Sequence, residues 1–332
     1  MSDAASDPPL RLAIIGCGGI AQAYLQALAR TKDLHLVAAV DVDPARATAA
    51  LAGTGGRAFT DVRALLAEAP ADAALVLTPP NTHETISVRL LQQGVNVLCE
   101  KPLTTSTPSA MRMLQAATAT RRLLMMGSKF RYTPDVGKAH ELLAQGIVGE
   151  PLLFENVFCA RVDMTKRWNS VRAIAGGGVL LDNGCHSVDI ARFLLGPIAR
   201  VQAQFAKPVQ PLEVEDTARL LFESQDGVMG SVDLSWSLHK EVPSYVRVYG
   251  SKGALEVGWK VSRYKLEGQK DWTPFGQGYD KVGAFAAQLA NFAAAIRGRQ
   301  APVITEVDAL ASVQVIEAAY RSAQAQKWHE LL

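Results

Sequence analysis

The first 127 residues alternate short apolar runs with helical patterns of apolar residues. Residues 10–15 form the first run, and helical spacing continues after it through Tyr24, Leu25 and Leu28. Further runs, separated by helical patterns, lie at residues 35–40, 72–78, 95–98 and 123–127. Strands of a parallel sheet are buried on both faces and therefore read as continuous apolar runs. These five runs and the helical patterns between them are typical of a dinucleotide-binding sheet, so we expect a parallel sheet of six strands with intervening helices.

The pattern changes at Lys129. Residues 129–134 begin a helical pattern that ends near Gly146, and the segments beyond Pro151 are longer and alternate polar with apolar residues. Such segments lie at residues 201–205, 217–222, 228–236 and 245–249, and helical patterns follow at 282–296 and 307–325. Asp226-Gly227 between two of the segments is typical of a hairpin turn. This part of the chain predicts a mainly antiparallel sheet with one open face.

Composition narrows the class of protein. With 332 residues the chain is too long for one ordinary core, so two domains are expected. Its 34 basic and 32 acidic residues leave a net charge of +2, which argues against a nucleic-acid or membrane surface built on charge. Four cysteines without a Cys-x-x-Cys pair indicate reduced thiols in a cytoplasmic protein. No apolar run approaches the roughly 18 residues that a membrane span needs.

A glycine-rich turn follows the first apolar run. Gly16-Cys17-Gly18-Gly19-Ile20-Ala21 has the form G-x-G-x-x-A and leads into a helical pattern. Gly16 permits a tight turn, Gly18 lets the backbone approach a pyrophosphate, and the helix N-terminus offers free N–H groups to that anion. The second run ends in Asp41, whose carboxylate can accept hydrogen bonds from both adenosine ribose hydroxyls and would repel a 2′-phosphate. We expect NAD, with NADP as the alternative because Arg46 lies near Asp41 in the sequence.

These patterns together predict an α/β protein of two domains. We expect an N-terminal Rossmann dinucleotide-binding domain over residues 1–127, of which 1–9 are a disordered tail. A C-terminal α+β domain with a large, mainly antiparallel open sheet is expected over residues 128–332.

Charged and polar residues end two neighbouring runs of the predicted parallel sheet. Glu100-Lys101-Pro102 follows one run, and Pro102 stops that strand. Thr78-Pro79, with Asn81 and His83 close behind, follows the run before it. Open α/β sheets bind ligands at this carboxyl edge, so we expect these residues near a ligand. The alternative is an ordinary surface Glu-Lys pair at a strand end.

Asp182 and His186 lie in a glycine-flanked segment between the two parts of the chain. In a helix they are four residues apart and point the same way. The structural alternative makes Asp182 a helix cap and His186 a half-buried core residue. A Cys185-His186 nucleophile pair is disfavoured because adjacent helical residues do not face each other.

The glycine turn, Glu100-Lys101-Pro102 and the Asp182-x-Gly-x-His186 pattern together resemble the glucose–fructose oxidoreductase/inositol dehydrogenase (Gfo/Idh/MocA) family. The resemblance covers nearly the whole chain, and the combination of the last two motifs is specific to that family. It implies that Lys101 and His186 flank the reacting carbinol, that Asp182 orients the substrate, and that the C-terminal sheet builds homodimers or homotetramers. The cofactor contacts that it implies are Gly16, Gly18, Gly19, Ile20, Asp41, Thr78, Pro79, Asn81, His83, Glu100 and Lys101.

The resemblance and the residue chemistry predict NAD-dependent oxidation of a secondary alcohol on a sugar or cyclitol, or the reverse reaction. A neutral imidazole suits removal of the hydroxyl proton, so His186 is the expected general base. Lys101 would donate to the developing alkoxide, and Asp182 would bind a neighbouring hydroxyl or hold His186. No metal is expected, because the nicotinamide supplies the hydride chemistry. The alternatives are a keto-sugar reductase in sugar biosynthesis and a non-catalytic NAD-binding sensor.

The charge of the substrate depends on residues that follow the first domain. Lys129, Arg131 and Arg167 could favour a phosphorylated or carboxylated sugar. In the alternative, the two arginines pair with carboxylates such as Asp135 or Asp163, and Lys129 is solvated. We expect that alternative and a neutral substrate, with an aromatic face and an amide for its C–H groups and hydroxyls. The expected substrate contacts are Lys101, Arg131, Arg167, Trp168, Asn169, Asp182 and His186.

Overall fold

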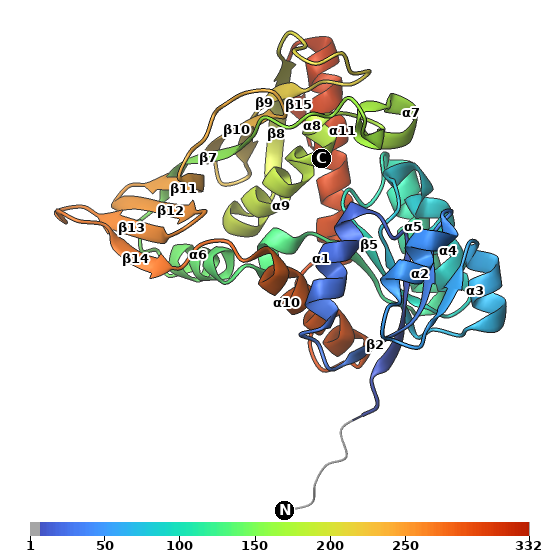
Figure 1. The fold of residues 1–332 in the computed structure, drawn as a ribbon. Helices are drawn as coiled ribbons and strands as arrows, with labels where there is room; N and C mark the ends of the chain where they lie inside the picture. Colours follow the sequence, from blue (N-terminus) through green and yellow to red (C-terminus); the bar gives the residue numbers. More distant parts are fainter. Residues whose placement is uncertain (1–6, 332) are drawn as a thin grey trace, which may run out of the picture.

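The computed structural model describes residues 7–331, which form two β-sheets with helices around them (Figure 1). Residues 1–6 of the expected tail lie outside the described residues. Within residues 7–9, which are exposed, Asp7 pairs with Arg299 at 2.6 Å and the Pro8 carbonyl accepts a hydrogen bond from Arg297. No helix within residues 7–331 combines the length and apolar character needed to cross a membrane.

The first sheet has six parallel strands in the order β3-β2-β1-β4-β5-β6, as expected. Its strands are β1 (Leu10–Ile15), β2 (Leu34–Val40), β3 (Arg57–Phe59), β4 (Ala73–Val76), β5 (Asn96–Glu100) and β6 (Leu124–Gly127). The order reverses between β1 and β4, so the carboxyl ends of these two strands open a crevice for a ligand. The three-residue β3 was not located from the sequence because it is too short to show a pattern.

Five helices connect the strands of this sheet: α1 (Gly19–Leu28), α2 (Pro44–Ala50), α3 (Val62–Glu68), α4 (His83–Gln92) and α5 (Thr107–Thr120). Side chains of Asp43, Asp61 and Ser106 accept hydrogen bonds from backbone N–H groups at the starts of α2, α3 and α5. Gly94, with φ of +80°, turns the chain from α4 into β5. Local sequence thus sets where these elements begin and end.

The second sheet has nine strands in the order β14-β13-β12-β11-β7-β10-β9-β8-β15, and every pairing except β7 with β10 is antiparallel. The strands are β7 (Pro151–Cys159), β8 (Ile198–Phe205), β9 (Thr217–Ser224), β10 (Met229–Ser235), β11 (Ser244–Gly250), β12 (Gly253–Gly258), β13 (Ser262–Leu266), β14 (Thr273–Gly276) and β15 (His329–Glu330). Gly227, with φ of +81°, lies in the turn between β9 and β10. The expected hairpin and the expected fold class are confirmed.

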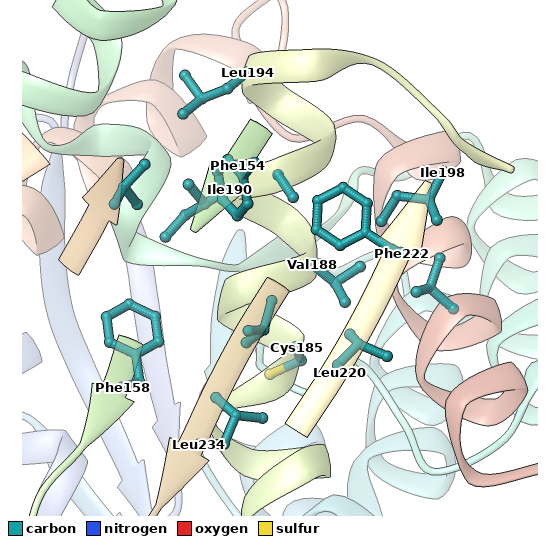
Figure 2. Close-up of a cluster of buried hydrophobic side chains, with 14 of the residues drawn as sticks. Phe154, Phe158, Cys185, Val188, Ile190, Leu194, Ile198, Leu220, Phe222 and Leu234 are labelled. Atoms are coloured by element: carbon teal, nitrogen blue, oxygen red, sulfur yellow. The ribbon is translucent and has the colours of Figure 1, made fainter. Parts of the chain in front are cut away.

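One face of the second sheet is covered by helices. Figure 2 shows side chains of α9 (Gly184–Leu195) packed against those of β7, β9 and β10. α6 (Pro134–Ala144) and the far half of α11 (Glu306–Ala325) join this core. The opposite face leaves apolar side chains exposed, among them Leu153, Leu221 and Met229. Met229 lies directly across from Leu153, so these side chains form part of one surface.

Two late helices return to the first sheet. α10 (Lys281–Ile296) lies beside α1 (Figure 1), and Phe285 contacts Tyr24 with ring centroids 4.4 Å apart. α11 begins against α5 through Ala309 and Val313 and continues to the second sheet. Residues from beyond position 127 therefore belong to the hydrophobic clusters around the first sheet. The expected division into two domains at residue 127 stays a prediction.

Candidate functional site

A cavity of about 570 Å³ lies over the glycine turn and the carboxyl ends of β1, β2 and β4. α1 begins at Gly19 without a side-chain cap, so its first N–H groups are free for an anion. A Cβ atom at Gly18 or Gly19 would meet no atom within 4 Å, which leaves open space over this helix end. Gly16 has φ of +93°, and a Cβ there would lie 2.9 Å from the Leu77 backbone. These features fit the pyrophosphate of a dinucleotide.

Asp41 forms the wall of this cavity at the end of β2. Its Oδ2 accepts a hydrogen bond from the Cys17 backbone N–H at 2.7 Å, and Oδ1 accepts from that of Asp43 at 2.9 Å. Each oxygen keeps a lone pair that a ribose hydroxyl could use. Arg46 also lines the cavity, and its Nε lies 3.3 Å from Asp43. The carboxylate thus has the fixed position that adenosine recognition requires.

The structure divides the expected cofactor residues into two groups. Those on the wall of the cavity are Gly16, Gly18, Gly19, Asp41, Thr78 and Pro79. Those elsewhere are Ile20, which packs on the hydrophobic cluster beside β1, Asn81, His83, Glu100 and Lys101. His83 is buried, and its ring faces the carbonyls of Thr78, Pro102 and Leu103. Its side chain therefore joins two loops at the sheet edge, which corrects the expected cofactor contact.

A second cavity, of about 440 Å³, holds all three expected catalytic residues. Its polar and charged lining consists of Lys101, Lys129, Arg167, Asn169, Asp182, Asn183, His186, Ser235 and Lys281. Phe130, Phe158, Trp236, Trp259 and Tyr279 supply aromatic walls. Arg167 and Asn169 line this cavity while Trp168 between them lines the first, so the two cavities adjoin here. Trp168 had been expected against the substrate, and its place on the cofactor side is a correction.

Lys101 and Asp182 form an ion pair in the second cavity. Lys101 Nζ donates to Asp182 Oδ1 at 2.6 Å and to the Asp182 carbonyl at 2.9 Å. Burial alone would lower the pKa of Lys101, but the negative groups around it, Asp182 foremost and Glu100 among them, together outweigh burial and hold the pKa above its ordinary value. Lys101 is therefore a permanent cation that can donate to a substrate oxygen. The surface Glu-Lys alternative is excluded, because both Glu100 and Lys101 are largely enclosed.

Glu100 holds the end of β5 in place through hydrogen bonds. Its Oε1 accepts a hydrogen bond from Tyr24 Oη at 2.7 Å, and Tyr24 Oη accepts another from Gln288 Nε2 at 2.8 Å. Glu100 Oε2 accepts from the Lys101 backbone N–H at 3.1 Å. Burial raises the pKa of Glu100, although the charges of Lys101 and Lys129 oppose the shift. Through these contacts α1 and α10 fix the position of Lys101.

His186 lies on the first turn of α9, with its Nε2 atom 3.2 Å from Lys129 Nζ. Its ring packs edge-on against Phe130, and only 5% of the residue is exposed. Burial lowers the pKa of His186 well below 6.5, and the charges of Lys129 and Lys101 lower it further. A neutral imidazole with a free ring-nitrogen lone pair is the form that a general base needs.

Asp182 and His186 lie on consecutive short helices, α8 (Val179–Asp182) and α9, which Asn183 joins. Glu215 holds the start of α8: its Oε1 accepts from the N–H groups of Gly178 and Leu180 at 3.0 and 3.2 Å. A Cβ at Gly178 would lie 2.0 Å from the Glu215 carbonyl oxygen, so only glycine fits there. Cys185 is buried with its thiol toward the Asp182 carbonyl, and burial raises its pKa to about 12. That thiol is not an activated nucleophile.

Arg131 does not line either cavity, which corrects its expected substrate contact. Its guanidinium pairs with Asp189 at 2.7 Å and Asp308 at 3.0 Å, and its side chain is 4% exposed. Pairing with structural carboxylates was expected, but with different partners. Lys129 was expected to be solvated and instead faces His186.

Several lining residues were not identified from the sequence. Lys281 begins α10, and Trp259 and Tyr279 come from loops more than 70 residues beyond His186. No local pattern marks these residues, because only the folded chain brings them to the cavity. Within residues 7–331, no three His, Cys, Asp or Glu side chains are grouped as a metal ion would need.

Two family models match the chain over most of its length. A model described as an oxidoreductase family with an NAD-binding Rossmann fold matches residues 10–128, and the GFO/IDH/MocA C-terminal domain matches residues 136–256. The chain belongs to the Gfo/Idh/MocA family. The resemblance seen in the motifs is thereby confirmed, and the N-terminal part of this Gfo/Idh/MocA oxidoreductase is an NAD-binding domain.

Relatives in the Gfo/Idh/MocA family are similar along almost the full chain. Rhizopine catabolism protein MocA of Rhizobium meliloti is 28% identical over 315 residues, which are 93% of each chain. Inositol 2-dehydrogenase of Rhizobium meliloti (strain 1021) is 26% identical over 94% of this chain and 96% of its own. The crystal structure of GenD2 from gentamicin A biosynthesis, in complex with NAD, is 29% identical and superposes with a TM-score of 0.86 over 98% of this chain and 97% of its own.

Proposed function

We propose that this protein is a dehydrogenase that transfers hydride between NAD and a secondary alcohol carbon of a sugar or cyclitol. The observation that carries the proposal is that Lys101, Asp182 and His186 line one cavity beside the cavity over the glycine turn. Lys101 follows a strand of the first sheet, whereas the other two residues lie on helices that cover the second. Similarity to an inositol 2-dehydrogenase supports the substrate class.

The roles of the three residues follow from their protonation. His186, neutral because its pKa is lowered, accepts the hydroxyl proton at its unprotonated ring nitrogen as the alcohol is oxidised. Lys101 donates from Nζ to the oxygen on which negative charge develops. Asp182 keeps Lys101 charged and oriented, and its second oxygen can accept from a neighbouring substrate hydroxyl. Bound NAD would accept the hydride from the carbinol carbon.

Cofactor choice in this proposal is set by Asp41. A 2′-phosphate would bring negative charge close to this carboxylate, whereas the two ribose hydroxyls can donate to it. Arg46 is drawn toward Asp43 by an ion pair and is less available to a phosphate. NAD is therefore preferred over NADP.

Assembly into homodimers or homotetramers belongs to the same proposal. The open face of the second sheet carries Leu153, Leu221 and Met229, which are 43%, 37% and 59% exposed. An apolar surface of this kind on a sheet is typical of an interface between subunits. Location in the cytoplasm stays a prediction from the cysteine pattern.

The reverse reaction, reduction of a keto-sugar, would use the same residues with His186 returning the proton. A sensor that only binds NAD would not need two proton-handling groups in a second cavity. The test is incubation of the purified protein with NAD or NADP and a panel of aldoses and inositols, followed by the absorbance of the reduced nicotinamide. We expect turnover with NAD on at least one member. NAD binding without turnover in either direction, across sugars and keto-sugars, would favour the sensor.

A further inference from the structure

The cavity that holds Lys101 and His186 has an excess of positive charge. Its basic lining residues are Lys101, Lys129, Arg167 and Lys281, whereas Asp182 is its acidic lining residue. Asp182 is already paired with Lys101. None of the ion pairs formed within residues 7–331 involves Lys129, Arg167 or Lys281. These three cations are therefore available to a negatively charged ligand.

Lys129 is the one of the three that reaches the reacting centre. Its Nζ lies 3.2 Å from His186 Nε2 and over the rings of Phe130 and Phe285, 4.8 and 5.8 Å from their centroids. The charged groups around it are Glu100 at the end of β5, Lys101 in the loop that follows, Asp182 on α8 and Lys281 on α10.

The surroundings of Lys129 penalise its charge. Burial and the neighbouring Lys101 ammonium lower its pKa to about 8, with Glu100 and Asp182 opposing the shift. The amine is still mostly protonated at neutral pH. An ammonium group that is partly desolvated, without a carboxylate in direct contact, gains more from a bound anion than a solvated lysine does.

The remaining wall of the cavity suits a ring. Phe158, Trp236, Trp259 and Tyr279 present aromatic faces to the same space. Such faces pack against the C–H groups of a sugar or cyclitol. Arg167 and Lys281 are both exposed and lie at the rim, where they attract negative charge from solution.

We propose that the substrate is an acidic sugar or cyclitol, and that its carboxylate or phosphate group contacts the ammonium group of Lys129, with Arg167 and Lys281 at the rim. This inference rests on the dehydrogenase function proposed above. It departs from the neutral substrate expected from the sequence, because Lys129 faces His186 instead of solvent. Of the three residues that could have made the cavity basic, only Arg131 is withdrawn from it, and Lys281 takes its place.

The kinetic test compares matched substrates with NAD at neutral pH: glucose, glucuronate and glucose 6-phosphate, then galactose, galacturonate and galactose 1-phosphate, then myo-inositol and its 1-phosphate. We expect kcat/KM to be at least tenfold higher for an acidic member than for its neutral parent. Comparison of the uronates with the phosphates shows which of the two anionic groups the cavity prefers. Equal or better kcat/KM for the neutral parents would overturn the inference while leaving the dehydrogenase function intact.

Variants locate the anion contact. Lys129→Met should remove most of the preference for the acid, whereas Lys129→Arg, which keeps the charge, should retain much of it. Lys166→Met is the matched control, because Lys166 adjoins Arg167 in the chain but does not line the cavity. A preference unchanged in Lys129→Met, or lost equally in Lys166→Met, would assign the effect to overall charge and not to this site.

A binding measurement keeps the test independent of turnover. We expect glucuronate or glucose 6-phosphate to raise the Tm of the NADH-saturated protein more than glucose does, at constant ionic strength. The difference should vanish in Lys129→Met and, in the wild type, as the pH rises through about 8, where Lys129 loses its proton. Equal shifts for acids and glucose would contradict the inference. Acid-specific binding with no oxidation or reduction of any compound would instead contradict the dehydrogenase function.

Discussion

At the scale of single residues, two basic groups in one cavity have pKa values shifted in opposite directions. The Asp182 carboxylate raises the pKa of Lys101, whereas burial and two nearby ammonium groups lower that of His186. Such a separation of pKa values supports the proposed roles of Lys101 as hydrogen-bond donor and His186 as base. Both shifts depend on distances of a few ångströms, so replacing one neighbour should alter them measurably.

Lys101→Met and His186→Ala should each lower kcat by roughly 10²–10⁴ on the true substrate, because a hydrogen-bond donor or a base is lost from the transition state. Neither residue lines the cavity over the glycine turn, so the Kd for NAD should change little. Steady-state kinetics and NAD titration measure the two quantities. Near-normal kcat in either variant would refute the role assigned to that residue.

The pH profile tests the electrostatic coupling of His186. A base works above its pKa, so wild-type kcat/KM for a neutral substrate should stay level as the pH falls through 6.5 and decline only at lower pH. Lys129→Met removes one of the charges that lower the pKa of His186, and the decline should move to higher pH. If kcat/KM declines at the same pH in the wild type and in Lys129→Met, the coupling between Lys129 and His186 is contradicted.

Asp41 is the residue on which the proposed preference for NAD depends. Asp41→Ala should raise the Kd for NAD by roughly ten- to a hundredfold, because hydrogen bonds to a charged group contribute about 1.5–3 kcal/mol. It should also relieve the repulsion of NADP. Asp41→Asn serves as the control, since it keeps an acceptor for the Cys17 N–H but removes the charge. Tighter binding of NADP than of NAD by the wild-type protein would overturn the assignment.

At the scale of elements, the proposed catalytic geometry depends on one half-buried carboxylate, that of Glu215, at the start of a four-residue helix. Glu215 Oε1 accepts hydrogen bonds from two N–H groups of α8 and from Tyr320 Oη at 2.6 Å. A helix this short cannot hold its own conformation, so its position comes from this contact and from packing. Asp182 ends α8, and any movement of α8 would displace it.

Glu215→Ala should therefore reduce both stability and catalysis. Leaving buried N–H groups without an acceptor costs about 1–3 kcal/mol, and kcat/KM should fall further than the loss of folded protein explains. Glu215→Gln keeps the acceptor oxygen and should be milder, and Tyr320→Phe removes only one donor. Denaturant midpoints and kcat/KM measure the two effects. The structural account fails if Glu215→Ala loses no more stability than Glu215→Gln.

At the scale of the whole molecule, a buried ion cluster joins the two sheets. Arg131 follows the first sheet in η2 (Lys129–Tyr132), Asp189 lies on α9 against the second sheet, and Asp308 begins α11. Ser128 Oγ donates to Asp189 Oδ2 at 2.7 Å. The cluster lies where the chain passes from one sheet to the other. We therefore expect it to fix the position of one sheet, and of the cavity beside it, relative to the other.

Arg131→Met should destabilise the protein by about 3–5 kcal/mol, because it leaves the fully buried Asp189 carboxylate, and the partly buried Asp308 carboxylate beside it, without their cation. The matched control is Arg200→Met, whose pair with Glu223 is on the surface and should cost less than about 1 kcal/mol. Urea unfolding of both variants measures the difference. Equal, small losses would show that the cluster is not a structural link between the sheets.

Much of this fold could be predicted from local sequence. The parallel sheet appears as apolar runs because its strands are buried on both faces, and the hairpin at Gly227 appears because its turn needs a positive φ. β7, β12, β13, β14 and β15 were missed. Many residues of β12, β13 and β14 are only half-buried and show no clear alternation. For Asp182 and His186, spacing alone left a structural alternative open, and the cavity that both residues line supports the proposed catalytic role.

The sequence by itself determined the family, the NAD-binding turn and the three residues proposed for catalysis, because each lies in a short motif whose spacing carries its geometry. Only the tertiary structure decided the charge of the substrate cavity. It withdrew Arg131 into an ion pair, brought Lys129 to His186 and added Lys281 from a distant helix. A charge balance is a sum over neighbours in space. Residues far apart in the chain become neighbours only when the two sheets pack together.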